Sequence, residues 1–553
     1  MRTSAIISLL LILAQSPALW SQTVFLSHSS LVFNTTSVNT LDSASFWIIN
    51  ASSVPVQISD INVFKPVFSI RDTSGTISTA DSMRVWVFFK TNQNVTWRDV
   101  VTIEINDVRN SFPLPVQGSA LFGDSYDPTT ANLWDNDLKS ALHGLISPHI
   151  DLGYNLARDR MFETIDDPLG IDTIECVYTG RRIRAVTRIE AQNQQFNTEH
   201  TWPQSTFNSL DPMRADLNHL YPTDETANSM RSNNPFGPVV SNITWQSGGS
   251  KLGFNPNGLL AFEPRDIHKG DAARAVFYFM LRYENNYAGY LDLLQEIYLR
   301  QWYASDPVSQ KEILRNNTIA TFQGKRNPLI DHPEFIQRIS SFRSLTPPSL
   351  VPDIRVSPLS MDFGTASVGD SVEWLCTIVN IGRGPLSVSG ISIDNPSDGF
   401  HVADGISTIP ADSFAQIRIR FTPLDPNQAF STSLRITSND PDEGIRIVPI
   451  TGVSSVTSIA AGRTVPNEFL LLQNYPNPFN PSTSIAFSLD KTGQVSLKVF
   501  SVLGEELATL VNEVRNPGWY NVRFNGLTLP SGTYFYRLET TSRTKTRRMI
   551  LLK

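Results

Sequence analysis

The sequence feature that most constrains the fold is a β-rich pattern that occurs twice, on either side of a long segment of different character. Residues 22–119 and 346–455 both consist of short runs in which apolar and polar residues alternate between turn-forming clusters. Such alternation is typical of strands with one buried face. The pattern therefore predicts two copies of one β-sandwich flanking a separate domain. The corresponding segments are Leu31-Val32-Phe33 with Met361-Asp362-Phe363, Ile48-Ile49-Asn50 with Ile378-Val379-Asn380, and Pro115-Val116-Gln117-Gly118 with Pro449-Ile450-Thr451-Gly452.

Composition limits the classes of protein that this chain can be. At roughly 150 residues per domain, 553 residues predict three to four domains. The net charge of −7 provides no global basic field, so any binding to nucleic acid must use a local patch. The only two cysteines, Cys176 and Cys376, exclude a disulfide framework and a cysteine-based metal cluster. We expect both to be small buried side chains.

The first residues predict a signal peptide over residues 1–21. Arg2 precedes an apolar run from Ala5 to Ala14, which is shorter than the roughly 20 residues that span a bilayer. A short apolar core after a basic residue is typical of a secretory signal, with cleavage expected near Ser21. No later run reaches transmembrane length, so we expect an exported protein without a transmembrane segment.

The middle segment, residues 120–345, predicts an α+β domain. Helical spacing of apolar residues predicts helices from Asp266 to Tyr283 and from Tyr287 to Tyr303. Asp331, followed by Pro333 and Glu334, predicts a third helix start with Asp331 as its N-cap. This segment also contains six of the eight histidines: His143, His149, His200, His219, His268 and His332.

The last block, residues 466–553, follows a linker at 456–465 and predicts another β-sandwich. Strands are expected at 484–489, 495–502, 520–524, 533–539 and 549–552. The block opens with the residues NYPNPF at 474–479, contains SGTYFY at 531–536 and ends in a basic-then-apolar run. In these features it resembles the type A C-terminal sorting domain of the type IX secretion system. The flanking sandwiches, through Phe421-Thr422-Pro423 and Ser438-Asn439-Asp440-Pro441, resemble Ig-like modules of the ASH or choice-of-anchor kind.

Three polar segments of the middle domain predict a metal site. Glu199 and His200 are adjacent at an expected strand end, and Asn228 and Arg231 share one face of a following helix. A carboxylate and an amide oxygen suit a hard cation such as Mg²⁺ better than zinc. A neutral histidine beside it could take a proton from water, and an arginine could hold a phosphate. Together they predict metal-assisted phosphodiester hydrolysis, although neighbouring strand residues serve one site only where the strand ends or twists.

The middle domain resembles the bacterial extracellular endonuclease I family. The shared features are Glu199-His200-x-x-Pro203, Asp216-Leu217-x-x-Leu220, and Asn228 followed by Arg231-Ser232-Asn233. The resemblance implies a ββα-metal, or His-Me finger, core. It implies that His200 is the general base, that Glu199 and Asn228 bind one Mg²⁺, Mn²⁺ or Ca²⁺ ion, and that the products carry a 5′-phosphate. It also implies a phosphate-binding arginine, for which the candidates are Arg214 and Arg231.

These features predict a secreted, largely sequence-independent endonuclease acting on DNA, with RNA left open as a substrate. We expect a monomer whose partners are nucleic acid and the type IX secretion machinery. The densest basic patch, Arg181-Arg182-Arg184-Arg188, is either a nucleic-acid contact or a solvated strand edge. Two alternatives remain: a cell-surface adhesion protein with an inactive nuclease-like domain, and a phosphodiesterase for another substrate. The retention of Glu199, His200 and Asn228 favours the nuclease over the adhesion protein.

Overall fold

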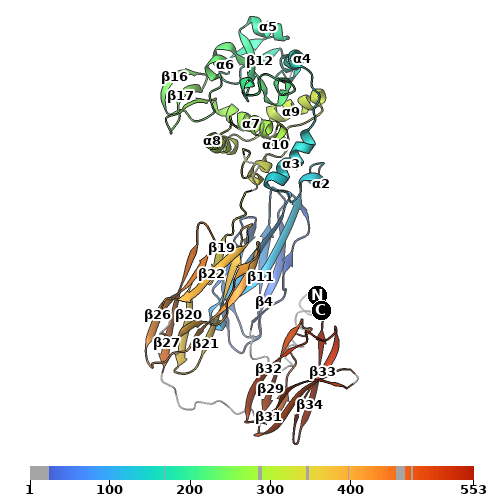
Figure 1. Ribbon diagram of the computed structural model, residues 1–553, viewed down its shortest axis with the longest axis vertical. Coiled ribbons are helices and arrows are strands. Elements are labelled where there is room, and N and C mark those ends of the chain that lie inside the picture. Colours follow the sequence, from blue (N-terminus) through green and yellow to red (C-terminus); the bar gives the residue numbers. More distant parts are fainter. Residues whose placement is uncertain are drawn as a thin grey trace.

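The computed structural model describes residues 24–552 except 168–169, 284–288, 344–347, 396–397, 456–467, 475–476 and 503. The described chain forms four clusters of buried apolar residues, one for each part of the molecule in Figure 1. The predicted signal peptide and linker lie outside the described residues. Across the described part of the chain, no helix combines the length and the apolar character needed to cross a membrane.

The first part is a β-sandwich built by residues 24–121. One sheet has the order β1-β4-β9-β7, and β10 and β11 form the centre of the facing sheet. Buried residues alternate with less buried ones along β4 and β9, as the sequence pattern predicts. The strands are β1 (Val24–Leu26), β2 (Leu31–Val32), β3 (Thr36–Ser37), β4 (Asp42–Asn50), β5 (Val56–Ile58), β6 (Asp60–Asn62), β7 (Phe68–Ile70), β8 (Gly75–Ile77), β9 (Ser82–Phe89), β10 (Thr96–Ile105) and β11 (Asn110–Leu121).

A second sandwich is built by residues 354–455. One sheet has the order β20-β27-β26-β22-β24, and β21 pairs with β25 and β19 in the other sheet. The strands are β19 (Ile354–Ser357), β20 (Met361–Ser367), β21 (Val372–Asn380), β22 (Leu386–Ile393), β23 (Phe400–Val402), β24 (Thr408–Ile409), β25 (Ser413–Phe421), β26 (Ala429–Ser438) and β27 (Ile445–Ser455).

Equivalent residues of the two sandwiches make equivalent contacts. Leu31 pairs with Val116 in a parallel register, and Met361 pairs with Ile450 in the same way. The Nδ2 atom of Asn50 donates to the carbonyls of residues 54, 77 and 78, while that of Asn380 donates to those of residues 384, 409 and 410. The correspondence found in the sequence therefore extends to buried polar contacts.

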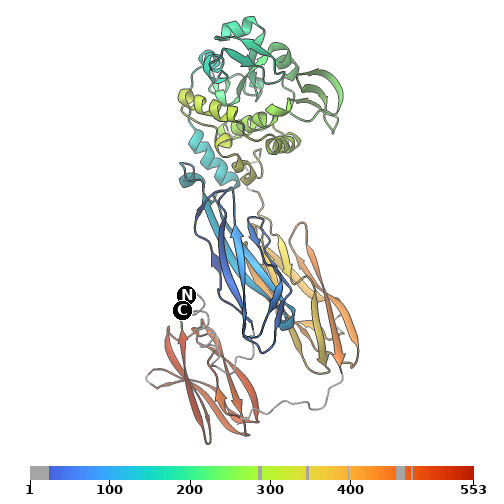
Figure 2. The ribbon, with the colours of Figure 1, turned by 180° about the vertical axis from the view of Figure 1, so that it is seen from behind.

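The two sandwiches are joined edge to edge. β11 pairs with β21 at Asn110 and Leu375, so strands of both sandwiches form one nine-stranded sheet. Across this seam, Ser111 Oγ lies 2.8 Å from Ser357 Oγ, and Thr377 Oγ1 donates to the Ser111 carbonyl at 2.7 Å. Figure 2 shows the pair side by side below the helical domain. The middle domain is thus inserted between two modules that share a sheet.

The middle domain is built around one buried helix, α7 (Lys269–Tyr283). Residues 272–282 are all buried, as expected for a helix that is covered on every side. Helix α7 confirms most of the helix predicted over 266–283, and α8 (Leu293–Ser305) confirms part of the second. The other helices are α2 (Asp127–Thr130), α3 (Asp135–Ile146), α4 (Tyr154–Arg160), α5 (Arg188–Asn193), α6 (Glu225–Arg231), α9 (Gln310–Gln323) and α10 (Pro328–Asp331). The strands are β12 (Thr173–Glu175), β13 (Arg182–Arg184), β14 (Phe196–His200), β15 (Leu220–Asp224), β16 (Ser241–Ser247), β17 (Ser250–Phe254) and β18 (Leu260–Glu263).

A 3-10 helix begins at Pro333, as the helix-start signal predicts, but its N-cap is His332 and not the predicted Asp331. Asp331 is the last residue of α10, and Asn327 caps that helix by accepting from the amide of Leu329. The carboxylate of Asp331 instead accepts hydrogen bonds from Arg326 and Tyr126. A capping carboxylate must be free to bind its own backbone, and these tertiary donors hold it elsewhere.

Arg338 anchors the middle domain to the first sandwich. Its side chain is buried and donates to the Leu133 and Thr130 carbonyls and to Asn94 Oδ1, at 2.9, 2.6 and 2.5 Å. Beside it, the Trp97 and Trp134 rings meet edge to face at 5.8 Å. A buried guanidinium satisfied by three acceptors fixes the angle at which α2 and α3 leave the sandwich.

The C-terminal block is a sandwich of two sheets with the orders β28-β29-β32 and β31-β30-β33-β34. The five predicted strands are present within a few residues, and β31 is an additional strand that the sequence prediction missed. Its exposed edge carries charged residues, which hide the alternation of a strand. The strands are β28 (Leu470–Leu471), β29 (Ser482–Leu489), β30 (Gly493–Phe500), β31 (Glu506–Arg515), β32 (Gly518–Asn525), β33 (Gly532–Thr540) and β34 (Thr544–Leu551).

Candidate active site

The candidate site is built on two antiparallel strands and the helix that follows them. β14 pairs with β15 so that Glu199 lies opposite Tyr221 and His200 opposite Leu220. Helix α6 begins directly after β15, where the Asp224 side chain accepts from the amide of Ala227 at 2.8 Å. This cap sets the first turn of α6 against β14. The order strand, strand, helix brings the three predicted segments together.

Only one of the two carboxylate oxygens of Glu199 contacts a polar side chain among the described residues. Its side chain is 2% exposed, and its Oε1 atom accepts from the Tyr178 hydroxyl at 2.8 Å and lies 3.2 Å from Arg231 Nε. Among the described residues, Oε2 has no hydrogen-bond partner. Burial raises the pKa of Glu199 to about 7, while Arg231 and Tyr178 act in the opposite direction. One carboxylate oxygen therefore remains available to a cation.

Asn228 is tethered beside the same strand. Its Nδ2 donates to the carbonyl of Thr198, the residue before Glu199, at 3.2 Å. This bond fixes which end of the amide is the acceptor, and Oδ1 has no partner within the described chain. Asn228 and Glu199 thus each present one unengaged oxygen from adjoining elements, which is the donor type that Mg²⁺ prefers.

His200 is the last residue of β14, and its side chain has different neighbours from that of Glu199. It is 6% exposed, and its Nε2 lies 3.2 Å from the carbonyl oxygen of Arg214. A carbonyl only accepts, so Nε2 carries the proton and Nδ1 is the basic nitrogen. Burial, and then His219, lower the pKa of His200 to about 3. The imidazole is therefore neutral near pH 7.

Arg214 reaches the site with its backbone and its side chain. Its carbonyl orients His200, while its guanidinium lies over the Tyr154 ring at 4.0 Å. The Nε atom is buried without a partner in the described structure. The structure thus places Arg214 next to His200, as the sequence prediction of a phosphate contact requires.

Arg231 does not lie where a phosphate contact would be. Its side chain is 0% exposed and donates to the Thr201 and Ser232 carbonyls and to the Tyr290 hydroxyl, at 2.7, 2.7 and 2.9 Å. Its Nε lies 3.2 Å from Glu199 Oε1, and the Phe236 ring lies 4.6 Å from the guanidinium. Because every side of the guanidinium is covered by protein, this placement favours a role in holding Glu199 over the predicted contact with substrate.

Replacing Arg231 tests that reading. Arg231→Met should lower the free energy of unfolding of the middle domain by about 3–5 kcal/mol, because it leaves a buried carboxylate and several acceptors unpaired. Calorimetry of the full chain would show the loss in one transition. Arg184→Met, at an exposed residue of β13, is the control and should change stability by less than about 0.5 kcal/mol. An Arg231→Met protein of normal stability that binds substrate weakly would support the original prediction instead.

The Asp216–His219 segment forms a buried network beside the site. Asp216 Oδ2 accepts from the Tyr283 and Tyr278 hydroxyls at 2.8 and 3.0 Å and lies 3.6 Å from His149 Nδ1. His219 Nε2 lies 2.7 Å from the Met213 carbonyl. These contacts fix the turn that carries Arg214. His219 is therefore a buried core histidine held through Nε2, while its Nδ1 has no partner among the described residues.

Three residues of the site were missed in the sequence. Tyr178 binds Glu199, while Tyr154 and Arg158 of α4 lie near His200; Arg158 Nε donates to Thr198 Oγ1 at 3.1 Å. Arg158 lies 40 positions before Thr198, and no local motif marks such a distance. A basic residue on a helix is usually solvated, so the sequence carried no signal for its burial.

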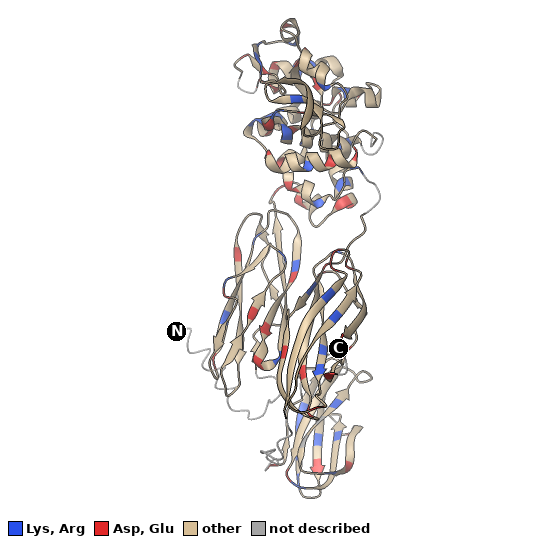
Figure 3. Ribbon diagram, turned by 90° about the vertical axis from the view of Figure 1, so that its left-hand side faces the viewer, with Lys and Arg blue, Asp and Glu red and all other residues tan. Residues whose placement is uncertain are grey.

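The predicted basic patch is largely engaged in local contacts. Arg182 pairs with Glu175 at 2.8 Å and Arg188 with Asp159 at 2.7 Å. Arg181 donates to the carbonyl of residue 194 at 3.1 Å. Figure 3 shows basic and acidic residues intermixed along the chain. These partners favour the reading of the patch as a solvated edge.

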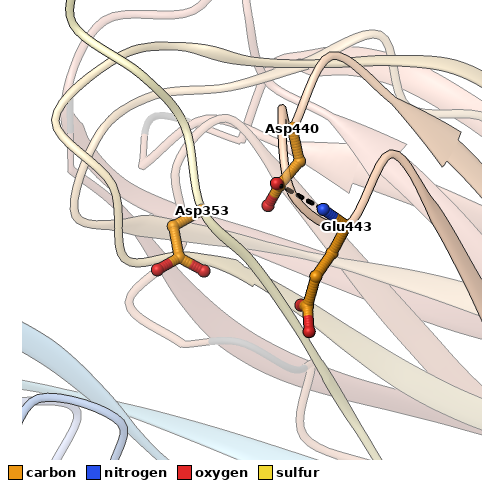
Figure 4. Close-up of side chains that lie close together, drawn as sticks. All are labelled: Asp353, Asp440 and Glu443. Carbon is orange, nitrogen blue, oxygen red and sulfur yellow. Dashed lines mark hydrogen bonds between the residues drawn. The ribbon is translucent and has the colours of Figure 1, made fainter. Parts of the chain in front are cut away.

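Another acidic cluster lies in the second sandwich. The carboxylates of Asp353, Asp440 and Glu443 lie within 4.8 Å of one another (Figure 4). Arg355 Nη1 contacts Asp353 at 2.5 Å and Glu443 at 3.0 Å, and Asp440 accepts from backbone amides including that of Ile354. The guanidinium supplies the positive charge, so this cluster joins β19 to the β26–β27 turn.

Comparisons with known proteins match three parts of the chain to known families. Residues 136–334 match Endonuclease I, residues 352–448 match the HYDIN/CFA65/VesB-like Ig-like domain, and residues 473–552 match the secretion system C-terminal sorting domain. An extracellular ribonuclease of Bacillus amyloliquefaciens is 34% identical over 223 residues, covering 36% of this chain and 73% of its own. That of Bacillus subtilis (strain 168) is 32% identical over 236 residues, covering 39% and 78%.

Among solved structures, the ASH/PapD-like domain of human CEP192 covers 20% of this chain and 94% of its own, at 13% identity. The TM-score of this match is 0.18, which is too low to assign a fold. The sequence and domain matches define a secreted or cell-surface nuclease with Ig-like and sorting domains. The chain belongs to the Endonuclease I family. The resemblances to endonuclease I, to an Ig-like module in the second sandwich and to the C-terminal sorting domain are thereby confirmed.

Proposed function

We propose that this protein is a secreted, divalent-metal-dependent endonuclease that cleaves DNA and RNA with little regard to sequence, through a ββα-metal core formed by β14, β15 and α6. The observation that carries the proposal is that Glu199 and Asn228, on adjoining elements, each leave one oxygen unengaged, and that a neutral histidine directly follows Glu199 on β14. The two Bacillus relatives are named extracellular ribonucleases, and this supports RNA as a substrate. Phosphates occur in both nucleic acids, and contacts to them carry no base information.

Glu199 and Asn228 would hold the cation. The available Oε2 and Oδ1 atoms fit a hard ion that keeps several waters and takes few protein ligands. When bound, such an ion supplies Lewis-acid stabilisation of the charge that develops on phosphate oxygens. Arg231 and Tyr178 contact Glu199 through its other oxygen, which leaves Oε2 unengaged by them.

His200 would accept the proton of the attacking water. The bond to the Arg214 carbonyl fixes the tautomer and leaves the Nδ1 lone pair available. Burial keeps the ring unprotonated in the resting protein. Attack by this water on phosphorus, with departure of the 3′ oxygen, gives the 5′-phosphate products that the family resemblance implies. Arg214 would contact the phosphate.

The direct test is cleavage by the full chain. Supercoiled plasmid should become nicked and then linear in Mg²⁺, single-stranded RNA should be degraded, and the products should carry 5′-phosphates. Intact plasmid and RNA under these conditions would favour the adhesion protein with an inactive domain. Cleavage of a small phosphodiester alone would favour the third alternative.

Secretion gives a separate prediction. Deleting residues 466–553 should leave nuclease activity in the periplasm and remove it from the medium, because the sorting block has its own apolar core and lies outside the candidate site. Zymography of cell and medium fractions would measure this. Wild-type levels of the truncated protein in the medium would contradict the sorting role; a lost unfolding transition of the middle domain would show damage to the nuclease instead.

A further inference from the structure

Two cations, the buried Arg158 and the partly buried Arg214, share one aromatic ring beside His200. The guanidinium of Arg214 lies 4.0 Å from the Tyr154 ring centroid, and that of Arg158 lies 4.8 Å from it. The same ring lies 5.5 Å from the His200 ring. Tyr154 and Arg158 are one turn apart on α4, so a single helix face brings both to the site.

Neither cation has an acidic partner. Within the described residues, no carboxylate oxygen lies within ion-pair distance of Arg158 or Arg214, whereas neighbouring Arg160 pairs with Glu163 and Arg188 with Asp159. Arg158 is 8% exposed, and only its Nε atom is engaged, with Thr198. Its two Nη groups have no hydrogen-bond partner in the described part of the chain.

Like charges held together away from water destabilise a fold unless an anion joins them. Burial and the neighbouring Arg188 and Arg214 act together to lower the pKa of Arg158, although Tyr154 and the more distant carboxylate of Asp159 oppose them. The free donors of Arg158 and the buried, unpartnered Nε of Arg214 are therefore available to an anion next to His200.

We propose that Arg158 and Arg214, supported by Tyr154, form a cradle for a phosphodiester of the bound nucleic acid, with Arg158 as a second phosphate contact beside Arg214. This inference rests on the proposed function. Two guanidiniums present several donors to one phosphate, so they can hold it at His200 without reading the bases. Tyr154 keeps both cations in place through its ring face.

The salt dependence of binding tests this contact. Each lost phosphate contact reduces the slope of log K against log salt by about 0.9 for duplex DNA. In the His200→Ala full chain with Mg²⁺, Arg158→Gln should weaken binding of a labelled duplex by about tenfold and reduce the slope by about 0.9. Arg158→Lys should retain the slope, because it retains the charge.

Two controls separate this role from a structural one. Arg160→Gln removes a charge from the same helix at a residue paired with Glu163 and stacked over Phe322, so it should not change the slope. Thr198→Val removes the partner of Arg158 Nε while keeping the cation, and should also keep the slope. An unchanged slope in Arg158→Gln, or an equal loss of slope in Arg158→Lys, would overturn the proposal.

Plasmid nicking by the wild-type chain is measured in parallel. Nicking with an unchanged Arg158→Gln slope refutes the cradle and leaves the nuclease intact. A reduced slope without any wild-type nicking supports the cradle and refutes the nuclease function. The two failures are therefore distinguishable.

Discussion

Removing divalent cations is expected to abolish cleavage of plasmid DNA by the full chain, and adding Mg²⁺ or Mn²⁺ in excess of the chelator should restore it. The reason is the donor set: Glu199 and Asn228 offer two oxygens, and such a site retains its ion weakly enough to lose it to EDTA. Without the ion, charge on the phosphate oxygens has lost its main source of stabilisation. Agarose electrophoresis across a metal titration measures the effect.

The acidic cluster of the second sandwich provides a control for this experiment. Within the acidic cluster of the second sandwich, Arg355 pairs with Asp353 and Glu443, and Asp440 accepts from backbone amides, so EDTA should leave the unfolding transition of that sandwich unchanged. Loss of activity together with unfolding would mean that the chelator removed a structural ion. Full activity in excess chelator would contradict the metal-dependent mechanism.

Much of the architecture could be predicted because its signals are local or repeated. The correspondence of Asn50 with Asn380 was visible as a matched tripeptide, and the structure gives both the same buried contacts. Helix α7 was visible because its apolar residues keep helical spacing. The Glu199–His200 pair and Asn228 lie on β14 and α6, elements whose order and spacing the sequence carries directly.

The rest depended on contacts between distant segments. The shared sheet needs Asn110 to meet Leu375, and no pattern within either sandwich specifies that pairing. Arg231 shares a helix face with Asn228, which made it a candidate for substrate contact. Its actual environment is set by Tyr290, 59 positions away, and by Glu199 on the adjoining strand. Arg158 was overlooked for the same reason, because its neighbours come from β14 and the turn before β15.

Separating the base from the ligand is the sharpest remaining test of the site. A general base contributes roughly 10²- to 10⁴-fold to rate, so His200→Ala should lose activity by about that factor while keeping its affinity for metal and for DNA. Its Nε2 is occupied by the Arg214 carbonyl, and Nδ1 is assigned to a proton rather than to the ion. Added imidazole should restore part of the rate, because only a proton acceptor is missing.

Glu199→Ala should behave differently. It should lose activity and also metal affinity, because a site with two protein ligands cannot spare one. Calorimetric titration with Mg²⁺, alongside plasmid nicking, measures both properties in each variant. Glu199→Gln is the matched variant, since it keeps an oxygen and the contact to Tyr178 while removing the charge; its affinity should fall between the wild type and Glu199→Ala. Loss of metal binding in His200→Ala, with binding intact in Glu199→Ala, would reverse the two roles, because the ion would then depend on the imidazole rather than on the carboxylate that Arg231 and Tyr178 hold.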